Sequence, residues 1–141
     1  MPTKKSQARS ADANDKALRA TVLKIVRNWS DLKIEANDPY YTHDADAVFF
    51  DVLPLKFVNW QDYKDGINKL IQDFSGQKIE PREVRTHRAG RFAWATFLWN
   101  TTVYFKDGRQ VELNGRSTQI LEKRQGKWIV IHEHWSVPAT L

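Results

Sequence analysis

Two histidines near the end of the chain, His132 and His134, have the spacing that most directly suggests chemistry. Side chains two positions apart on a β-strand point to the same face, so both imidazoles could reach one metal ion. His87 or Glu112 could then complete a metal site, because zinc accepts nitrogen and carboxylate ligands. The same pair could instead act as ligand-binding or active-site histidines without a metal.

The preceding strand offers a simpler interpretation of the histidines. If the last turn is a three-residue loop, Thr118 lies opposite His132 and Arg116 lies opposite His134. Opposed polar side chains of this kind stabilise a sheet as cross-strand pairs. The sequence favours such a polar cluster over a metal site, and we expect neither a metal nor another cofactor.

Arg116 has two further interpretations. Its planar guanidinium could anchor the carboxylate of an acidic ligand, since it binds such groups through two parallel hydrogen bonds. It could also form an ion pair with Glu112 or Glu133 across the sheet. The sequence favours the ion pair.

Three tryptophans could shape a ligand pocket. Large rings at the open end of an apolar sheet face give a cavity its walls, so we expect Trp99 and Trp135 to line one, with plain core packing as the alternative. Trp60 precedes a predicted helix and could form a lid or only fix the start of that helix.

The composition is that of a single globular domain. The 141 residues are 41% hydrophobic and 12% aromatic, and a chain of this length buries roughly two thirds of its unfolded surface. The absence of cysteine excludes disulfides, thiolate nucleophiles and cysteine-ligated zinc. No apolar run approaches the roughly 20 residues that span a bilayer, and no secretory signal is visible, so we expect a cytoplasmic protein.

The formal net charge of +5 raises the question of nucleic-acid binding. Lys4, Lys5 and Arg9 supply three of these charges within residues 1–11, which are rich in Ser, Lys and Gln and lack hydrophobic periodicity. We therefore expect a flexible basic tail over 1–11, a single domain over 12–141, and no nucleic-acid partner.

Apolar periodicity and turn residues predict the elements. Helical spacing predicts two helices, ended by Pro39 and Gly76, with one short strand of β-branched and aromatic residues between them. After Pro81, turn signals separate four antiparallel strands. The predicted elements are helices over 12–36 and 61–74, and strands over 47–53, 82–88, 91–106, 109–123 and 127–137.

Both faces of the predicted sheet carry large apolar side chains. With three-residue turns, residues of equal parity share a face. The odd-numbered, more apolar face holds Phe97, Trp99, Val103, Phe105, Val111, Leu113, Leu121, Ile129, Ile131 and Trp135, together with Ser117, Gln119 and Glu133. The even-numbered face mixes polar residues with Trp94, Leu98, Tyr104, Ile120, Trp128 and Val130. Because helices can cover one side only, we expect a homodimer in which a second copy covers the other.

Three segments, FFDVLPL, GRST and GKWIVIHEHWSVP, occur in an order that resembles a known family. Residues 15–138 resemble the SnoaL-like, ketosteroid-isomerase-like branch of the nuclear-transport-factor-2-like (NTF2-like) superfamily. The ending is also similar to the association domain of calmodulin-dependent protein kinase. The resemblance implies an α+β, cone-shaped fold in which a curved antiparallel sheet wraps around N-terminal helices. It names no single reaction.

Within this resemblance, Asp51 is the catalytic candidate. It ends the segment DAVFFD, which is similar to the stretch that carries the general base of ketosteroid isomerases. A carboxyl in an apolar pocket has a raised pKa and can move a proton from a carbon beside a carbonyl. The alternative is an aspartate that ends a strand and caps the turn before Pro54.

The oxyanion hole of ketosteroid isomerases is not recovered. The resemblance places its helix tyrosine near Ser30 and its protonated aspartate on or beside Gln119. The Gln119 amide could still donate a hydrogen bond, and Tyr40 or Tyr41 could replace the phenol near the expected cavity mouth. The sequence therefore argues against steroid isomerisation itself.

Three functions remain open at this point. The leading hypothesis is a cofactor-independent isomerase, lyase or cyclase that binds a small apolar or carbonyl-bearing molecule and uses Asp51 as general base. The alternative is a non-catalytic ligand-binding or oligomerisation module of the same fold. A third hypothesis, a nucleic-acid or transport adaptor, predicts binding that depends strongly on salt.

Overall fold

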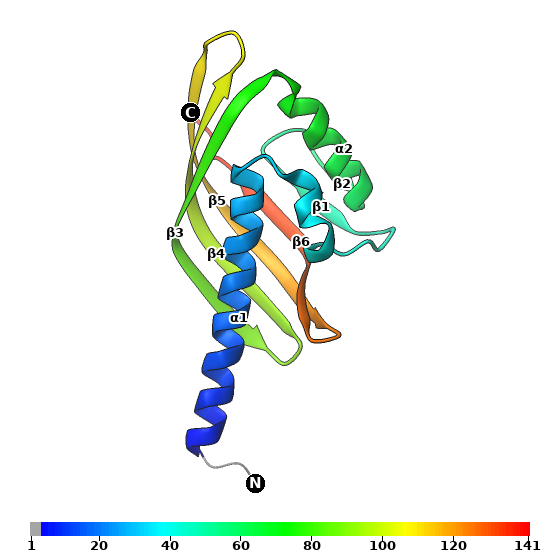
Figure 1. The fold of residues 1–141 in the computed structure, drawn as a ribbon, viewed down its shortest axis with the longest axis vertical. Helices are drawn as coiled ribbons and strands as arrows, with labels where there is room; N and C mark the ends of the chain where they lie inside the picture. Colours follow the sequence, from blue (N-terminus) through cyan, green and yellow to red (C-terminus); the bar gives the residue numbers. More distant parts are fainter. Residues whose placement is uncertain (1–3) are drawn as a thin grey trace.

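A curved sheet crossed by one long helix dominates the computed structural model (Figure 1). The structure describes the backbone of residues 4–141 and the side chains from residue 16 onward. The long helix lies against the inner face of the sheet, and a shorter helix lies beside its upper edge in Figure 1. This arrangement is α+β, as the sequence predicts.

Helix α1 (Lys4–Ser30) turns one apolar stripe toward the sheet. Leu18, Val22, Ile25, Val26 and Trp29 recur every three or four residues, and all five are buried. The tail predicted over 1–11 overlaps the first turns of α1. Residues 1–3 and the side chains before residue 16 lie outside the described residues, so the flexibility of this segment stays a prediction.

The first helix ends earlier than the predicted residue 36. Leu32 adopts a left-handed φ of 56°, and a 3-10 helix, η1 (Ile34–Tyr40), follows with Pro39 inside it. Periodicity misplaced the helix end because Leu32 and Ile34 continue the apolar pattern of the helix while belonging to a different backbone conformation.

Short elements then build one end of the molecule. They are strands β1 (Val48–Phe50) and β2 (Phe57–Val58), helix α2 (Trp60–Leu70) and the 3-10 turn η2 (Ile71–Asp73). The strand predicted over 47–53 contains β1, and the helix predicted over 61–74 corresponds to α2 with η2. The Asn59 side chain accepts a hydrogen bond from the backbone N–H of Asp62 and caps α2.

Four long strands form most of the sheet. They are β3 (Phe74–Ala89), β4 (Phe92–Phe105), β5 (Gln110–Arg124) and β6 (Lys127–Ser136). The strand order is β2-β1-β6-β5-β4-β3, with β1 parallel to β6. β3 begins well before the predicted start at residue 82, and it contains Pro81 because an edge strand tolerates a residue without a backbone N–H.

The pairing of β4 with β5 follows the predicted parity. Phe97 pairs with Ser117, and Trp99 pairs with Gly115. The side chains of Phe97, Trp99 and Ser117 are buried on the inner face, under the helices. The predicted apolar face is therefore correct for these two strands.

The turn before β6 has two residues rather than three, and this reverses the predicted faces of the first half of that strand. Trp128 and Val130 are consequently buried. A β-bulge at Ile131, which is skipped in the pairing with β5, restores the predicted faces from His132 onward. The placement of Ile129 and Ile131 on the apolar face is wrong, and both are half-buried.

The turn and the bulge each shift the pairing by one residue, which changes the neighbours of the histidines. His134 lies opposite Thr118, and Ser136 lies opposite Arg116. The predicted pairs, Thr118 with His132 and Arg116 with His134, are therefore wrong by two residues. The last turn has two residues, with φ values of 50° and 79°, rather than the assumed three.

The outer face of the sheet, away from the helices, keeps apolar side chains in solvent. The exposed fraction is 40% for Phe92, 42% for Trp94, 43% for Tyr104 and 37% for Ile120. Within the part of the chain that the structure describes, no helix has the length and apolar character to cross a bilayer.

Candidate active site

A cavity of about 320 Å³ lies between the inner face of the sheet and the elements α1, α2 and η2. Its wall is mainly apolar, and a volume of this size suits a small organic molecule. Four of the lining residues have acidic, amide or hydroxyl side chains: Asp51, Asp73, Gln77 and Thr101. Asp73 is exposed, whereas Asp51 is mostly buried.

Asp51 follows directly on β1, whose pairing with β6 fixes where its carboxyl lies. The backbone N–H of Val52 donates to Oδ1 of Asp51 at 2.6 Å, and the hydroxyl of Tyr63 lies 2.6 Å from Oδ2. Burial raises the pKa of Asp51 to about 6, although these two hydrogen bonds favour the anion. Asp51 is thus a carboxyl in an apolar cavity wall that changes protonation close to neutral pH.

Glu133 lies deeper, on the inner face of β6, and is 0% exposed. The hydroxyl of Tyr41 donates to its Oε1 at 2.5 Å, and the Gln119 amide donates to the same atom at 3.1 Å. Its Oε2 lies 2.6 Å from the Tyr63 hydroxyl. Burial raises the pKa of Glu133 to about 7, and the nearby Asp51 adds to the rise.

Tyr63 links the two carboxyls, because its hydroxyl lies within hydrogen-bonding distance of both. Burial, followed by the charges of Asp51 and Glu133, raises the pKa of Tyr63 well above its usual value. Burial and Glu133 raise the pKa of Tyr41 in the same way. Both phenols therefore stay protonated at neutral pH and act as hydrogen-bond donors.

Packed rings hold the two hydroxyls in place. The indole N–H of Trp29 donates to the Tyr41 hydroxyl at 2.9 Å, and the Tyr41 ring stacks on Trp60 with centroids 4.4 Å apart. The Tyr63 ring stacks on Phe57 at 4.9 Å. Buried rings with this many neighbours have little freedom to rotate, so the geometry around the carboxyls is fixed before any ligand enters.

Three of the residues predicted from sequence line the cavity: Asp51, Trp99 and Trp135. The Trp99 indole N–H donates to Oγ of Ser117 at 2.9 Å, which fixes that ring in the wall. The prediction that these tryptophans shape the pocket therefore agrees with their position.

Four other predicted ligand-binding residues lie near the site without lining the cavity. Tyr41 and Gln119 are buried and bond to Glu133, so Gln119 is not placed to donate to a ligand oxyanion. Trp60 is 3% exposed and packs in the core, which is incompatible with a lid. Tyr40 is half-buried and packs against the same core.

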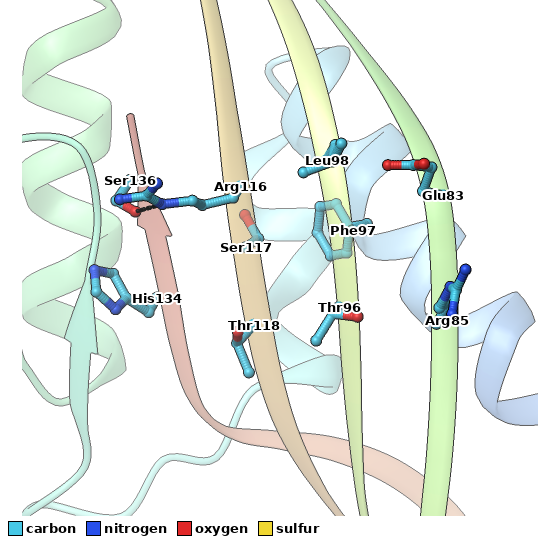
Figure 2. Close-up of a pocket in the computed structure, with 10 residues that line it drawn as sticks. All are labelled: Glu83, Arg85, Thr96, Phe97, Leu98, Arg116, Ser117, Thr118, His134 and Ser136. Atoms are coloured by element: carbon cyan, nitrogen blue, oxygen red, sulfur yellow. Dashed lines mark hydrogen bonds between the residues drawn. The ribbon is translucent and has the colours of Figure 1, made fainter. Parts of the chain in front are cut away.

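Arg116 and His134 lie on the opposite side of the sheet. They contribute to a groove of about 490 Å³ on the outer face (Figure 2). In Figure 2 Arg116 reaches toward Ser136, and its Nε donates to Oγ of Ser136 at 3.2 Å. The predicted ion pair with Glu112 or Glu133 is absent among the described residues, since Glu133 is on the inner face.

His132 and His134 do not converge on a common site with other ligands. The Nδ1 atom of His132 lies 2.6 Å from the carbonyl oxygen of Val48, and the Phe50 ring contacts both imidazoles edge-on. Across the residues whose side chains are described, no group of three or more His, Cys, Asp or Glu could hold a metal ion.

Sequence reasoning did not identify Glu133 and Tyr63 as site residues. Glu133 was assigned to the odd-numbered, more apolar strand face, and Tyr63 falls within the second predicted helix. A glutamate on an otherwise apolar strand face was the available signal, because an acid buried there needs donors from neighbouring elements. Which elements supply those donors depends on how α2 packs, and the sequence pattern does not give this.

Comparisons with known proteins agree with this architecture. A structure from Salmonella enterica serovar Typhimurium, described as an NTF2-like superfamily protein, is 17% identical with a TM-score of 0.83 and covers 92% of this chain and 94% of its own. A structure from Novosphingobium aromaticivorans, provisionally named a scytalone dehydratase, is 11% identical with a TM-score of 0.82. The match covers 95% of this chain and 90% of that structure. The association domain of CaMKII from C. elegans is 15% identical with a TM-score of 0.69. The match covers 91% of this chain and 98% of that domain. At these identities the likeness concerns the fold alone.

No curated protein sequence matches the chain. The family of SnoaL-like domains matches residues 17–140, which is nearly all of the part that forms the sheet and its helices. The resemblance seen in the sequence is therefore confirmed at the level of family and fold. The chain belongs to the SnoaL-like domain family and has the NTF2-like, α+β fold of that superfamily.

Proposed function

We propose that this protein catalyses a cofactor-independent proton transfer on a small, mainly apolar, carbonyl-bearing molecule bound in the inner cavity. The observation that carries the proposal is the Asp51 carboxyl, mostly buried in an apolar wall and hydrogen-bonded by Val52 and Tyr63. Reactions of this type include isomerisation and the elimination of water.

The chemistry follows from the protonation of Asp51. With a pKa of about 6, Asp51 is largely ionised at neutral pH, yet it is a stronger base than an exposed aspartate. It takes a proton from a carbon beside the substrate carbonyl, and the electron pair of that C–H bond moves onto the carbonyl oxygen. The carboxyl then returns the proton to the same molecule at a second position or to a leaving group.

The substrate class follows from the rest of the wall. Each of the four long strands contributes apolar side chains to the cavity wall, and Trp99 and Trp135 offer flat surfaces that suit ring systems. Thr101 and Gln77 are the hydroxyl and amide groups of the lining; the Gln77 amide donates to the backbone carbonyl of Trp29 at 3.0 Å, which leaves its second N–H for a carbonyl oxygen of the substrate.

The test is exchange of solvent deuterium into small cyclic ketones, followed by NMR. Wild-type protein should accelerate exchange at carbons beside the carbonyl of at least one ketone, and Asp51→Asn should lower that rate by about 10²- to 10⁴-fold. Asp46→Asn is the matched control, since Asp46 is exposed in the same segment, and it should leave the rate unchanged. Equal rates for wild type and Asp51→Asn would reject the proposal.

A second candidate function, assembly into a homo-oligomer, is favoured by the outer face. Trp94 and Ile120 pair across β4 and β5, and both are more than one third exposed. Exposed apolar side chains grouped on one sheet face are typical of protein interfaces. The likeness to an association domain supports this candidate, which is compatible with catalysis on the inner face.

A further inference from the structure

Three oxygen atoms, from Asp51, Tyr63 and Glu133, follow one another from the cavity wall into the closed interior. Oδ2 of Asp51 is 2.6 Å from the Tyr63 hydroxyl oxygen, which is 2.6 Å from Oε2 of Glu133. Each of these contacts is short enough to require a hydrogen atom between the oxygens. Tyr63 supplies one hydrogen atom, so the second must belong to one of the carboxyls.

The burial of the two acids decides which carboxyl holds that proton. Glu133 is 0% exposed, whereas Asp51 lies at the cavity wall and is partly reached by solvent. Leaving a fully enclosed carboxylate ionised costs more free energy than ionising one at a cavity wall. Protonated at Oε2, Glu133 donates to Tyr63 and still accepts from Tyr41 and Gln119 at Oε1.

The groups that face Glu133 support this arrangement. The titratable ones are Tyr41, which follows η1, Tyr63 of α2, and Asp51 at the end of β1. The other neighbour, Gln119 of β5, is neutral. No Lys, Arg or His among the described residues forms an ion pair or hydrogen bond with Glu133, so no cation compensates a charge there.

We propose that Glu133 is a positioning residue that retains a proton, and that it thereby aims the Tyr63 hydroxyl at Asp51 and keeps the cavity-facing carboxyl as the anion. This role rests on the proposed function, in which Asp51 is the base. During proton transfer, the substrate proton moves to Asp51 and the electron pair of the broken C–H bond stays on the substrate. The proton of Glu133 remains where it was.

The test is a carbon-13 NMR titration of the aspartate and glutamate side-chain carboxyls, which needs no substrate. In wild-type protein Asp51 should titrate first, near pH 6, and Glu133 second, near pH 7. In Glu133→Gln the amide replaces a protonated acid, so the midpoint of Asp51 should move by less than about 0.5 pH unit. Glu112→Gln, on the exposed outer face, is the control.

Two results would overturn the proposal. One is wild-type Glu133 titrating before Asp51, a measurement that needs no variant and holds even if Glu133→Gln does not fold. The other is a fall of about one unit or more in the Asp51 midpoint in Glu133→Gln, which would mean that an ionised Glu133 had been raising it. A different result would separate the two proposals. If Asp51 titrates before Glu133 but the protein does not accelerate deuterium exchange, the proposed function is rejected. The assignment of the proton to Glu133 would still stand.

Discussion

Asp51 and Glu133 share the hydroxyl group of Tyr63, which lies 2.6 Å from an oxygen of each carboxyl. One carboxyl belongs to the cavity wall and the other to the closed interior, so a single side chain of α2 couples the cavity to the core of the sheet. This coupling accounts for why two acids occur in so apolar a region.

Stability should depend on pH through Glu133. Its pKa is about 7 in the folded protein and about 4.5 without the fold, so the folded state binds the proton more tightly. The free energy of unfolding therefore falls as pH rises from about 4.5 to about 7, by on the order of 3 kcal/mol for this residue. Glu133→Gln should remove this slope, as measured by urea unfolding across that range.

Asp51 titrates in the same interval, so the comparison between variants isolates Glu133. Asp46→Asn is the control and should keep the wild-type slope, because Asp46 is exposed. A wild-type unfolding free energy that runs parallel to that of Glu133→Gln at every pH would contradict the assignment.

Tyr63→Phe should raise the pKa of Asp51 above about 6, because the anion loses a hydrogen-bond donor. It should also destabilise the fold by about 1–3 kcal/mol, since two buried carboxyls lose a partner. Carboxyl NMR and thermal unfolding measure the two effects. Tyr104→Phe, at an exposed position, should change neither, and an unaltered Asp51 midpoint in Tyr63→Phe would exclude the link.

Gly115→Ala should disturb the cavity wall. A Cβ atom on Gly115 would overlap the indole ring of Trp99, which lies over this backbone position and lines the cavity. The ring must move or the strand must shift, which costs about 1–3 kcal/mol. Gly76→Ala is the control, because its Cβ would meet Tyr104 at 3.8 Å, an ordinary contact. Equal melting temperatures for the two variants would show that Trp99 is not confined by Gly115.

Ile120→Lys should weaken self-association if the outer face is the contact between copies. A charge placed beside Trp94, its partner across β4 and β5, would have to be desolvated in that contact. Sedimentation velocity should then show a shift from dimer to monomer. Gln72→Lys adds the same charge at an exposed position of η2, on the other side of the sheet, and should leave the dimer intact. A wild-type monomer at high concentration would contradict the prediction.

The sequence was sufficient for the two α-helices, β1 and the four long strands, because apolar periodicity and turn residues are local. It failed where a tertiary contact set the backbone. Leu32 keeps the helical apolar spacing although the helix has ended, and the bulge at Ile131 has no local signal. The two-residue turn exchanged the faces of Trp128 and Val130, and the turn and the bulge together displaced the partners of both histidines by two residues.

The site was predictable only in part for a related reason. Asp51 was proposed through the resemblance of its segment to that of ketosteroid isomerases, and Trp99 and Trp135 through their strand face; all three line the cavity. Glu133 and Tyr63 come from distant segments, and only the packing of α2 on the sheet brings them together. Arg116 and His134, which looked more reactive, lie on the other side of the sheet.

The pH dependence of deuterium exchange into a ketone that the protein accepts tests the central claim most directly. The rate should rise with pH through a midpoint near 6, the pKa of Asp51, and level off above it, and Asp51→Asn should lack this rise. A rate that climbs instead through about pH 4, or that shows the same profile in Asp51→Asn, would contradict the assignment of Asp51 as the base.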